Sequence, residues 1–333
     1  TYIRAMFVTG ERFILALGTD PSTRMRLKWP DQDDRTDWTP SAANTANERT
    51  LQYGSKLMAG AALSDGINLV WSDTAVYVFQ YTGQSSIYDS RLAGTDCGLI
   101  SKLAFTRVGG AAFWMSGHHF HMYANGISFV PNQEDIRQWV YENIDPDGIT
   151  KTWCVYDHKN NQVRWHFCSA GSSEPDLYVD VNLEDFSWTI GTLDRTTGTP
   201  FRTFDASSLH VSSDGYIYSH DEGKDADGAS MRSFIQFGLY ALTRGETNVD
   251  ISGIIPDCAR QTGALTVDVF TKERPNSTVN FDSQTVTIAD TDVLADCRVS
   301  GRHFSMVITS DVLGGDFRLG NFALETAGAG LRR

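Results

Sequence analysis

Two segments of the sequence, 68–83 and 111–126, match each other without a gap at an offset of 43 residues. Each has the pattern of a strand, a few turn residues, a second strand and a glycine turn, which predicts an antiparallel hairpin. Self-similarity at roughly 40–50 residues is typical of β-propellers, whose blades are four-stranded sheets. The alignment places Trp71 over Trp114, Tyr77 over Phe120 and Gly83 over Gly126.

Short runs of strand-forming residues, separated by Gly, Asp, Asn and Ser, occupy most of the chain. The clearest helical pattern is 132–144, where Asn132 can cap a short helix that has one apolar stripe. Blade-like units are expected at about 6–40, 57–83, 99–130, 150–193 and 201–222.

We therefore expect an all-β protein in which a β-propeller is followed by a β-sandwich. The propeller blades would cover 1–228 and would be irregular or incomplete in this chain, because only five partial blades can be placed. A C-terminal β-sandwich is expected over 229–326, and a loosely held tail over 327–333. Since the chain opens on Thr1 rather than an initiator methionine, we expect a processed product or a fragment of a longer protein.

The composition limits the classes of partner. The chain has 333 residues, 41% of them hydrophobic, which is enough to bury one large core or two smaller ones. Its 28 basic and 41 acidic residues give a formal net charge of −13. Such a surface repels phosphate and disfavours sequence-specific nucleic-acid binding, although a conduit for DNA works better when its wall does not hold the polyanion. The apolar runs are too short for a membrane span.

The cysteines are odd in number, widely spaced and without a Cys-x-x-Cys pair. This pattern fits neither a disulfide framework nor a zinc site, and it favours reduced thiols packed as small hydrophobic residues after folding in the cytosol. The residues are Cys97, Cys154, Cys168, Cys258 and Cys297.

Clustered aspartates offer oxygen ligands of the kind that calcium accepts. One cluster is Asp221, Asp225 and Asp227, and a second lies within 31–37. Neither has the alternating aspartates and the bidentate glutamate of a calcium-binding loop. We expect solvated acidic turns, with a calcium loop as the alternative.

His119 and His121 would point to one face of a strand, with His118 beside them, and could form part of a transition-metal site. No third ligand is evident, so we expect a polar blade face and no metal. The tryptophans on periodic strands, Trp165 among them, are expected to pack between blades rather than to form a carbohydrate platform.

The sequence contains no catalytic motif: Gly-x-Ser-x-Gly, His-Glu-x-x-His, a phosphate-binding loop and the sialidase-type Asp box are all missing. Paired carboxylates for glycoside cleavage can lie far apart in a chain, so a glycosidase stays open as an alternative. We expect no enzyme, no catalytic residues and no cofactor.

Eight short blocks follow one another along the chain: 12–18 (RFILALG), 27–40 (LKWPDQDDRTDWTP), 69–77 (LVWSDTAVY), 97–100 (CGLI), 113–116 (FWMS), 191–196 (GTLDRT), 214–218 (DGYIY) and 318–320 (RLG). In this order they resemble the tail hub or nozzle proteins of short-tailed phages, a group of virion proteins of the tail-tube or DNA-stabilisation propeller type.

The resemblance implies a propeller that carries a sandwich, assembled as a homo-oligomeric ring, commonly a hexamer, below the portal and its head-to-tail adaptor. It also implies assembly in the host cytoplasm, a place in the virion tail, tail fibres or a tip needle as further partners, and non-specific passage of double-stranded DNA. The alternatives are a glycan-binding propeller that recognises a receptor, or a glycosidase on the same scaffold.

Overall fold

The computed structural model describes residues 2–64, 66–83, 87–200, 208–243 and 247–328. These residues form an all-β protein with one α-helix and one short 3-10 helix in its described part. The chain divides into two compact units, Thr1–Asp221 and Glu222–Arg333. The division therefore falls at the start of the acidic segment 221–228, several residues before the expected boundary at 228.

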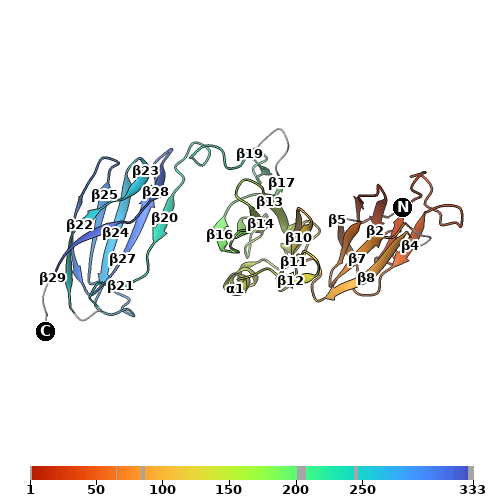
Figure 1. The fold of residues 1–333 in the computed structure, drawn as a ribbon, viewed down its shortest axis with the longest axis horizontal. Coiled ribbons are helices and arrows are strands. Elements are labelled where there is room, and N and C mark those ends of the chain that lie inside the picture. The colour runs from red at the N-terminus through yellow and green to blue at the C-terminus, as the bar shows by residue number, and fades with distance from the viewer. Residues whose placement is uncertain (1, 65, 84–86, 201–207, 244–246, 329–333) are drawn as a thin grey trace. The chain divides into compact units, whose positions relative to one another are not determined.

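In the first unit, the described strands form five sheets, each made by successive antiparallel strands (Figure 1). The first sheet contains β1 (Ala5–Val8), β2 (Ile14–Leu17), β3 (Arg26–Trp29) and β4 (Asn47–Thr50); the second, β5 (Leu57–Ala62), β6 (Ile67–Ser72), β7 (Ala75–Tyr81) and β8 (Tyr88–Thr95); the third, β9 (Phe105–Val108), β10 (Ala111–Met115), β11 (Phe120–Tyr123) and β12 (Ile127–Phe129). The fourth contains β13 (Trp153–Asp157), β14 (Gln162–Phe167), β15 (Leu177–Asn182) and β16 (Trp188–Thr192), and the fifth β17 (Thr197–Thr199), β18 (Leu209–Val211) and β19 (Ile217–Ser219). Helix α1 (Glu134–Asn143) and the 3-10 helix η1 (Ile149–Lys151) connect the third sheet to the fourth.

The sheets differ from the expected blade-like units mainly at their ends. The first sheet extends to Thr50, beyond the unit expected at 6–40, because its last strand β4 follows a long acidic loop. The second sheet extends to Thr95, beyond the unit expected at 57–83. Its last strand, β8, was not predicted because its mixed polar sequence gives little strand signal. The fifth starts at Thr197, whereas the unit expected at 201–222 begins outside the described residues.

Helix α1 is shorter than expected and Asn132 does not cap it. Asn132 has a φ of 57°, and its side-chain amide donates to the carbonyl of Phe186 at 3.3 Å. Gln133 occupies the cap position without a side-chain capping bond. Its amide instead accepts from the backbone N–H of Phe120 at 2.9 Å and donates to the carbonyl of Phe120 at 3.0 Å, which ties the start of the helix to β11.

The second sheet is buried on both faces at β6 and β7, and these two strands are almost continuously apolar. Val70 and Tyr77 belong to the core that this sheet shares with the first sheet. Leu69 and Trp71 belong to the core that extends over the second, third and fourth sheets. Because the faces alternate along β6, adjacent residues of this strand enter different cores.

The repeat seen in the sequence is displaced by one residue in the structure. Trp71 pairs with Val76 in the β6–β7 ladder, and Met115 pairs with Phe120 in the β10–β11 ladder. Equivalent positions are thus 44 residues apart, and Trp71 corresponds to Met115, not to Trp114. A shift of one residue places a side chain on the opposite face of a strand, so the predicted equivalence of the two tryptophans is wrong.

The serine turns at the ends of β6 and β10 agree with this register. Ser72 Oγ accepts from the backbone N–H of Ala75 at 2.8 Å and donates to the carbonyl of Ala75 at 3.1 Å. Ser116 Oγ accepts from the N–H of His119 at 3.1 Å and donates to the carbonyl of His119 at 3.0 Å. The two hairpins therefore have the same turn, again 44 residues apart.

The other two pairs of the sequence alignment shift in the same way. Tyr77 corresponds to His121 rather than to Phe120. Gly83 has a left-handed φ of 65°, whereas Gly126 is not among the glycines with positive φ. The glycine turns of the two hairpins are therefore different.

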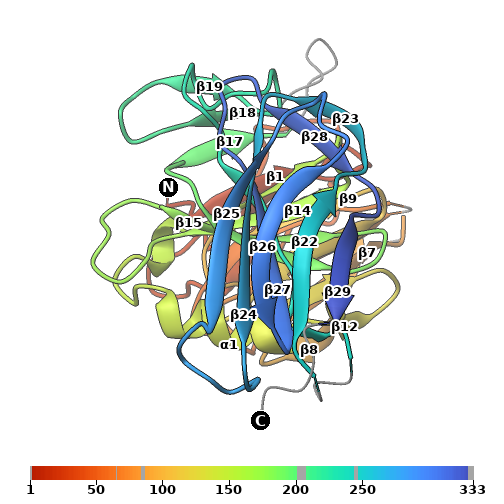
Figure 2. The same ribbon diagram turned by 90° about the vertical axis from the view of Figure 1, so that its left-hand side faces the viewer.

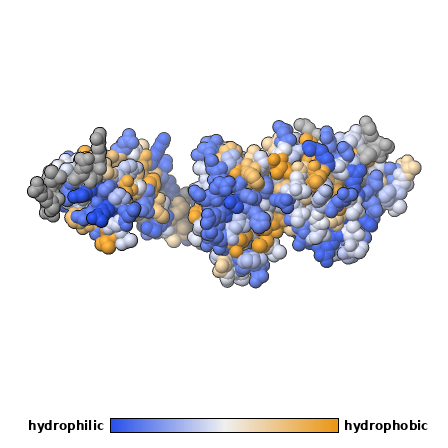
Figure 3. Space-filling model, turned by 90° about the horizontal axis from the view of Figure 1, so that it is seen from below, coloured by the Kyte–Doolittle hydropathy of each residue, from blue (hydrophilic) through white to orange (hydrophobic). Residues whose placement is uncertain are grey.

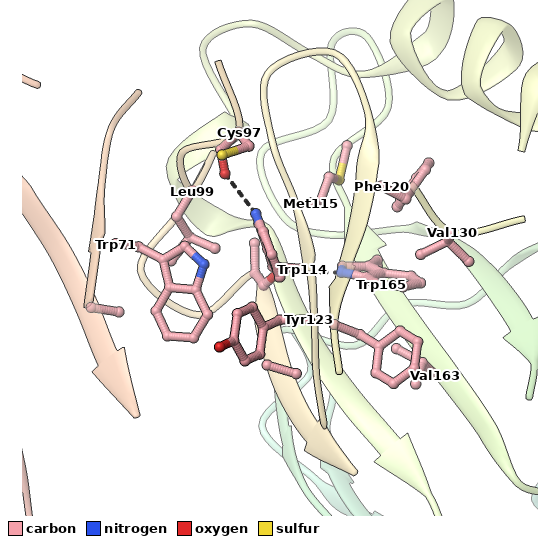
Figure 4. Close-up of a cluster of buried hydrophobic side chains, with 14 of the residues drawn as sticks. Trp71, Cys97, Leu99, Trp114, Met115, Phe120, Tyr123, Val130, Val163 and Trp165 are labelled. Carbon is pink, nitrogen blue, oxygen red and sulfur yellow. Dashed lines mark hydrogen bonds between the residues drawn. The ribbon is translucent and has the colours of Figure 1, made fainter. Parts of the chain in front are cut away.

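Trp71 and Trp114 contact each other because they lie on facing sides of neighbouring sheets (Figure 4). Their ring centroids are 5.7 Å apart with planes at 68°, an edge-to-face geometry that aromatic pairs favour. Trp114 Nε1 donates to the carbonyl of Cys97 at 2.7 Å, and Trp165 Nε1 donates to the carbonyl of Ala104 at 3.2 Å. The tryptophans thus hold successive sheets together.

The connection between the second and third sheets, 97–100, runs along both serine hairpins. The N–H of Leu99 donates to the carbonyl of Ser72, and the N–H of Ile100 donates to the carbonyl of Met115, each at 3.0 Å. A Cβ atom at Gly98 would lie 2.3 Å from the backbone of Asp73. Only glycine lets this connection pass so close to the β6–β7 turn.

In the second unit, the described strands form three sheets (Figure 2). The first consists of β20 (Ser233–Gln236), β27 (His303–Ser310), β24 (Leu265–Lys272) and β25 (Asp282–Ile288), with β21 (Tyr240–Ala241) also on β27; the second of β26 (Ala295–Gly301), β22 (Val249–Ile255) and β29 (Ala323–Gly328); the third of β23 (Cys258–Thr262) and β28 (Asp316–Leu319). Val267 and Val269 of β24 share one buried core with Ile251 and Ile254 of β22, so the two larger sheets face each other.

The expected start of a loose tail at residue 327 is wrong. Ala327 and Gly328 do not begin a loose tail, because they pair with Asp250 and Val249 in the β22–β29 ladder. The other residues of the expected tail, 329–333, lie outside the described residues.

Candidate functional site

The alternative of a calcium loop at Asp221, Asp225 and Asp227 is not supported by a ligand cluster among the described residues. The carbonyl of Asp221 accepts from Lys159 Nζ, and its carboxylate accepts from the Asn160 amide at 3.4 Å, both within the first unit. Asp225 belongs to the second unit and accepts from the N–H of Gly228 at 2.9 Å. Among the residues that the structure describes, no three His, Cys, Asp or Glu side chains converge as a metal site.

Two aspartates of the loop at 31–37 accept hydrogen bonds from threonines. Asp31 accepts from the N–H and the hydroxyl of Thr45 at 2.8 and 2.6 Å. Asp34 accepts in the same way from Thr36 at 2.9 and 2.6 Å. These hydrogen bonds lower the pKa of both carboxyl groups, and the bond from the threonine hydroxyl has the largest effect.

The expected polar face at His118, His119 and His121 is partly wrong, because His121 is buried. Its ring stacks on Trp114 at 5.4 Å and 17°, and its Nε2 lies 3.1 Å from Ser116 Oγ. Burial, and secondly the neighbouring His119, lower the pKa of His121 to about 4. His119 lies in the turn before β11 rather than on the strand.

A second cluster, which the sequence did not predict, lies where the fourth and fifth sheets meet. It consists of the buried histidines His166, His210 and His220. The ring centroids of His166 and His210 are 5.7 Å apart, and those of His210 and His220 are 3.9 Å apart. Trp153 stacks on His166 at 4.3 Å and 5° and meets His210 edge-on at 5.2 Å. The three residues come from separate parts of the chain, so no motif or spacing announces the cluster.

Arg195 closes one side of the histidine cluster. Its Nε donates to His220 Nε2 at 2.8 Å, and its guanidinium lies 4.3 Å from the centre of the Tyr218 ring. The carbonyl of Arg195 accepts from Trp153 Nε1 at 2.9 Å. A second cation, Arg164, lies on the same face of β14 as His166 and forms a two-pronged ion pair with Asp180 at 2.6 and 2.8 Å.

This environment keeps the three imidazoles neutral. Burial is the largest cause in each case, and it lowers the pKa of His210 to about 2 and the pKa of His220 to about 4. Burial, followed by Arg164, also holds the pKa of His166 well below its usual range. Both ring nitrogens of His166 and of His210 lack a hydrogen-bond partner among the described residues. The cluster is therefore a packed element whose stability depends on staying unprotonated.

No protein-family model matches the chain, and no curated protein matches it. Among solved structures, the chain is similar to an exo-β-1,3-galactanase from Phanerochaete chrysosporium with 8% identity and a TM-score of 0.32, over 94% of this chain and 93% of that one. It is also similar to PorZ, a surface component of the type-IX secretion system of Porphyromonas gingivalis, with 7% identity and a TM-score of 0.29, over 90% of this chain and 39% of that one. At these TM-scores the likenesses assign no activity.

No helix in the described part of the chain is long and apolar enough to cross a bilayer.

Proposed function

We propose that this chain is a structural component of a bacteriophage tail, part of a hub or nozzle ring that forms the DNA ejection conduit below the portal and adaptor. The observation that carries the proposal is the series of eight blocks that resemble tail hub or nozzle proteins. On this proposal the first unit contributes blades of an irregular or incomplete propeller, the second unit is a β-sandwich, and the protein resides in the virion tail.

The positions of the blocks support a scaffold role. Gly98 of one block lies against the β6–β7 turn, and Trp114 of another contacts Trp71 across two sheets. Arg195 and Tyr218, from two further blocks, stack on each other beside the histidine cluster. These residues hold sheets together, as expected for a structural protein.

Exposed apolar edges support assembly with neighbouring subunits. Met6 and Val8 are exposed on β1, which is the edge strand of the first sheet. Phe234, which is 55% exposed, and Ile235 lie on the edge strand β20. Apolar areas (orange) alternate with polar ones across the surface in Figure 3. Such edges invite pairing with another chain unless they are covered, and a closed ring of identical subunits covers them.

The composition of purified, DNase-treated phage particles tests this proposal. The chain should be found in stoichiometric amounts with the portal and adaptor. Its absence from intact particles would rule out the tail role.

Glycan binding is the second candidate function, because a cavity near Arg49 combines polar and aromatic side chains. The described residues that line this cavity include no Asp or Glu. This disfavours a glycosidase site there, since glycoside cleavage ordinarily requires a pair of carboxyl groups.

A further inference from the structure

A cavity of about 390 Å³ opens where the outer strands of the first and second sheets approach each other. Arg49 of β4 and Ser90 of β8 line it from opposite sides, and Arg49 Nη1 donates to Ser90 Oγ. Arg49 pairs with Leu27 and Ser90 with Phe79, and both partners point into the core that the two sheets share. Because paired residues lie on one face of a sheet, Arg49 and Ser90 face each other across the gap.

The loop that lines the cavity is held in place before any ligand arrives. The backbone N–H of Tyr53 donates to Tyr77 Oη at 2.7 Å, and the N–H of Ser55 donates to the Asp73 carboxylate at 2.8 Å. Tyr53 as a residue is nevertheless 51% exposed, so its ring is available at the surface. A fixed loop lowers the entropic cost of binding.

Among the described residues that line the cavity there is one cation and no acid, although the chain as a whole carries an excess of acidic residues. Arg49 is half-buried and takes part in none of the ion pairs found among the described residues. Its neighbour Glu48 is bound to Lys28 at 2.6 Å. A guanidinium has five N–H donors in a planar fork that matches a carboxylate. Arg49 therefore has donors left for an anionic group.

We propose that this cavity binds a saccharide that carries a carboxylate group. Arg49 pairs with the carboxylate, the exposed ring of Tyr53 stacks on the apolar C–H face of the sugar, and Gln52 and Ser90 bind its hydroxyl groups. The size of the cavity lies in the range of small-molecule sites, roughly 300–1,000 Å³. This inference rests on the second candidate function, glycan binding, and does not depend on the tail role.

A glycan array tests the inference with the full chain. The probes are glycans terminated by a hexuronate or a sialic acid, each printed beside its carboxyl-methylated counterpart, and apparent affinities come from a concentration series. We expect the acid to bind at least about tenfold more tightly than its methyl ester, the value of one charge-assisted hydrogen bond. Arg49→Gln should weaken binding of the acid by about the same factor and leave the ester unchanged.

Arg91→Gln is the matched control, because Arg91 is an exposed arginine next to Ser90 that is absent from the cavity lining. It should bind like the unmodified chain. Should Arg49→Gln fail to fold in a thermal melt, Arg49→Lys keeps the charge and removes the fork, and it should still weaken binding of the acid. Tyr53→Ala should weaken acid and ester alike.

Three results would overturn the inference. Equal binding of acids and esters would refute the role of the carboxylate and leave glycan binding intact. Displacement of the glycan by an equal concentration of acetate would reveal a simple anion site. A lack of binding to every glycan on the array would remove both the inference and the second candidate function.

Discussion

Arg195 donates a hydrogen bond from Nε to Nε2 of His220 over 2.8 Å, which fixes this buried imidazole as a neutral acceptor. His210 lies against His220 with ring centroids 3.9 Å apart. A proton on either ring would place a positive charge in a buried site beside Arg195 or a second imidazole, which is unfavourable. The contact between the fourth and fifth sheets thus depends on the protonation of its histidines.

We predict that acid destabilises the first unit. The folded state holds the pKa of His166, His210 and His220 below the ordinary value of 6.5, so the unfolded chain takes up protons first. The free energy of unfolding therefore reaches its maximum contribution from these histidines above about pH 6.5. It falls as the pH drops below that value, by up to about 1.4 kcal/mol per pH unit for each histidine. Urea unfolding between about pH 8 and pH 5 measures this slope.

Two variants distinguish the buried cluster from histidines in general. His166→Phe keeps an aromatic ring against Trp153 and should make the pH slope shallower by about one proton. His118→Gln changes an exposed side chain and should leave the slope as it was. A stability that does not change over this pH range would contradict the role assigned to the cluster.

We predict that Gly98→Ala destabilises the protein strongly. The added methyl group would lie 2.3 Å from the backbone of Asp73 and Thr74, so the connection between the second and third sheets would have to move. Overpacking of this kind typically costs about 1–3 kcal/mol. Gly117→Ala is the control, because no atom of the described residues lies within 4 Å of its Cβ position. Chemical denaturation should show a loss for the first variant and little change for the second.

We predict that Trp71 and Trp114 are energetically coupled. A double-mutant cycle with Trp71→Leu and Trp114→Leu should give a coupling of about 0.5–1.5 kcal/mol, because the two rings contact each other edge-to-face. If the two residues held equivalent positions that do not touch, their effects would simply add. Additive losses would thus contradict the register with an offset of 44.

The sequence predicted the all-β class and the hairpin repeat, since turn residues and apolar alternation are local signals. It misplaced the register by one residue because the second sheet is buried on both faces, so Val70 and Trp71 are both apolar and the sequence does not tell which face each occupies. A tryptophan matched to a tryptophan then looked like a repeat, although the two pack against each other.

Neither the histidine cluster nor the cavity at Arg49 could be predicted from the sequence. His166, His210 and His220 meet only through the packing of two sheets, and Arg49 reaches Ser90 from a strand of another sheet. Such contacts depend on tertiary structure, so the residues that form them have no characteristic spacing in the sequence. Asp221, Asp225 and Asp227 show the reverse case, since residues close in sequence fall into two different units.

We predict that the exposed edge strand β20 contributes to assembly. Phe234→Lys should lower the fraction of ring-sized assemblies in sedimentation velocity, because an exposed apolar edge gains stability when it is covered. The thermal unfolding of the monomer should change only slightly, since the substitution removes one exposed contact, that of the ring with the Arg232 guanidinium at 5.2 Å. Gln236→Lys adds the same charge on the same face of β20 and is the matched control. Normal assembly of the Phe234 variant would exclude β20 from the contact between subunits.

Immunogold electron microscopy of phage particles, with antibody raised against residues 1–333, tests the central claim most directly. The proposed role in the tail predicts gold label confined to the tail below the portal. A lack of label on intact and disrupted particles alike would contradict it.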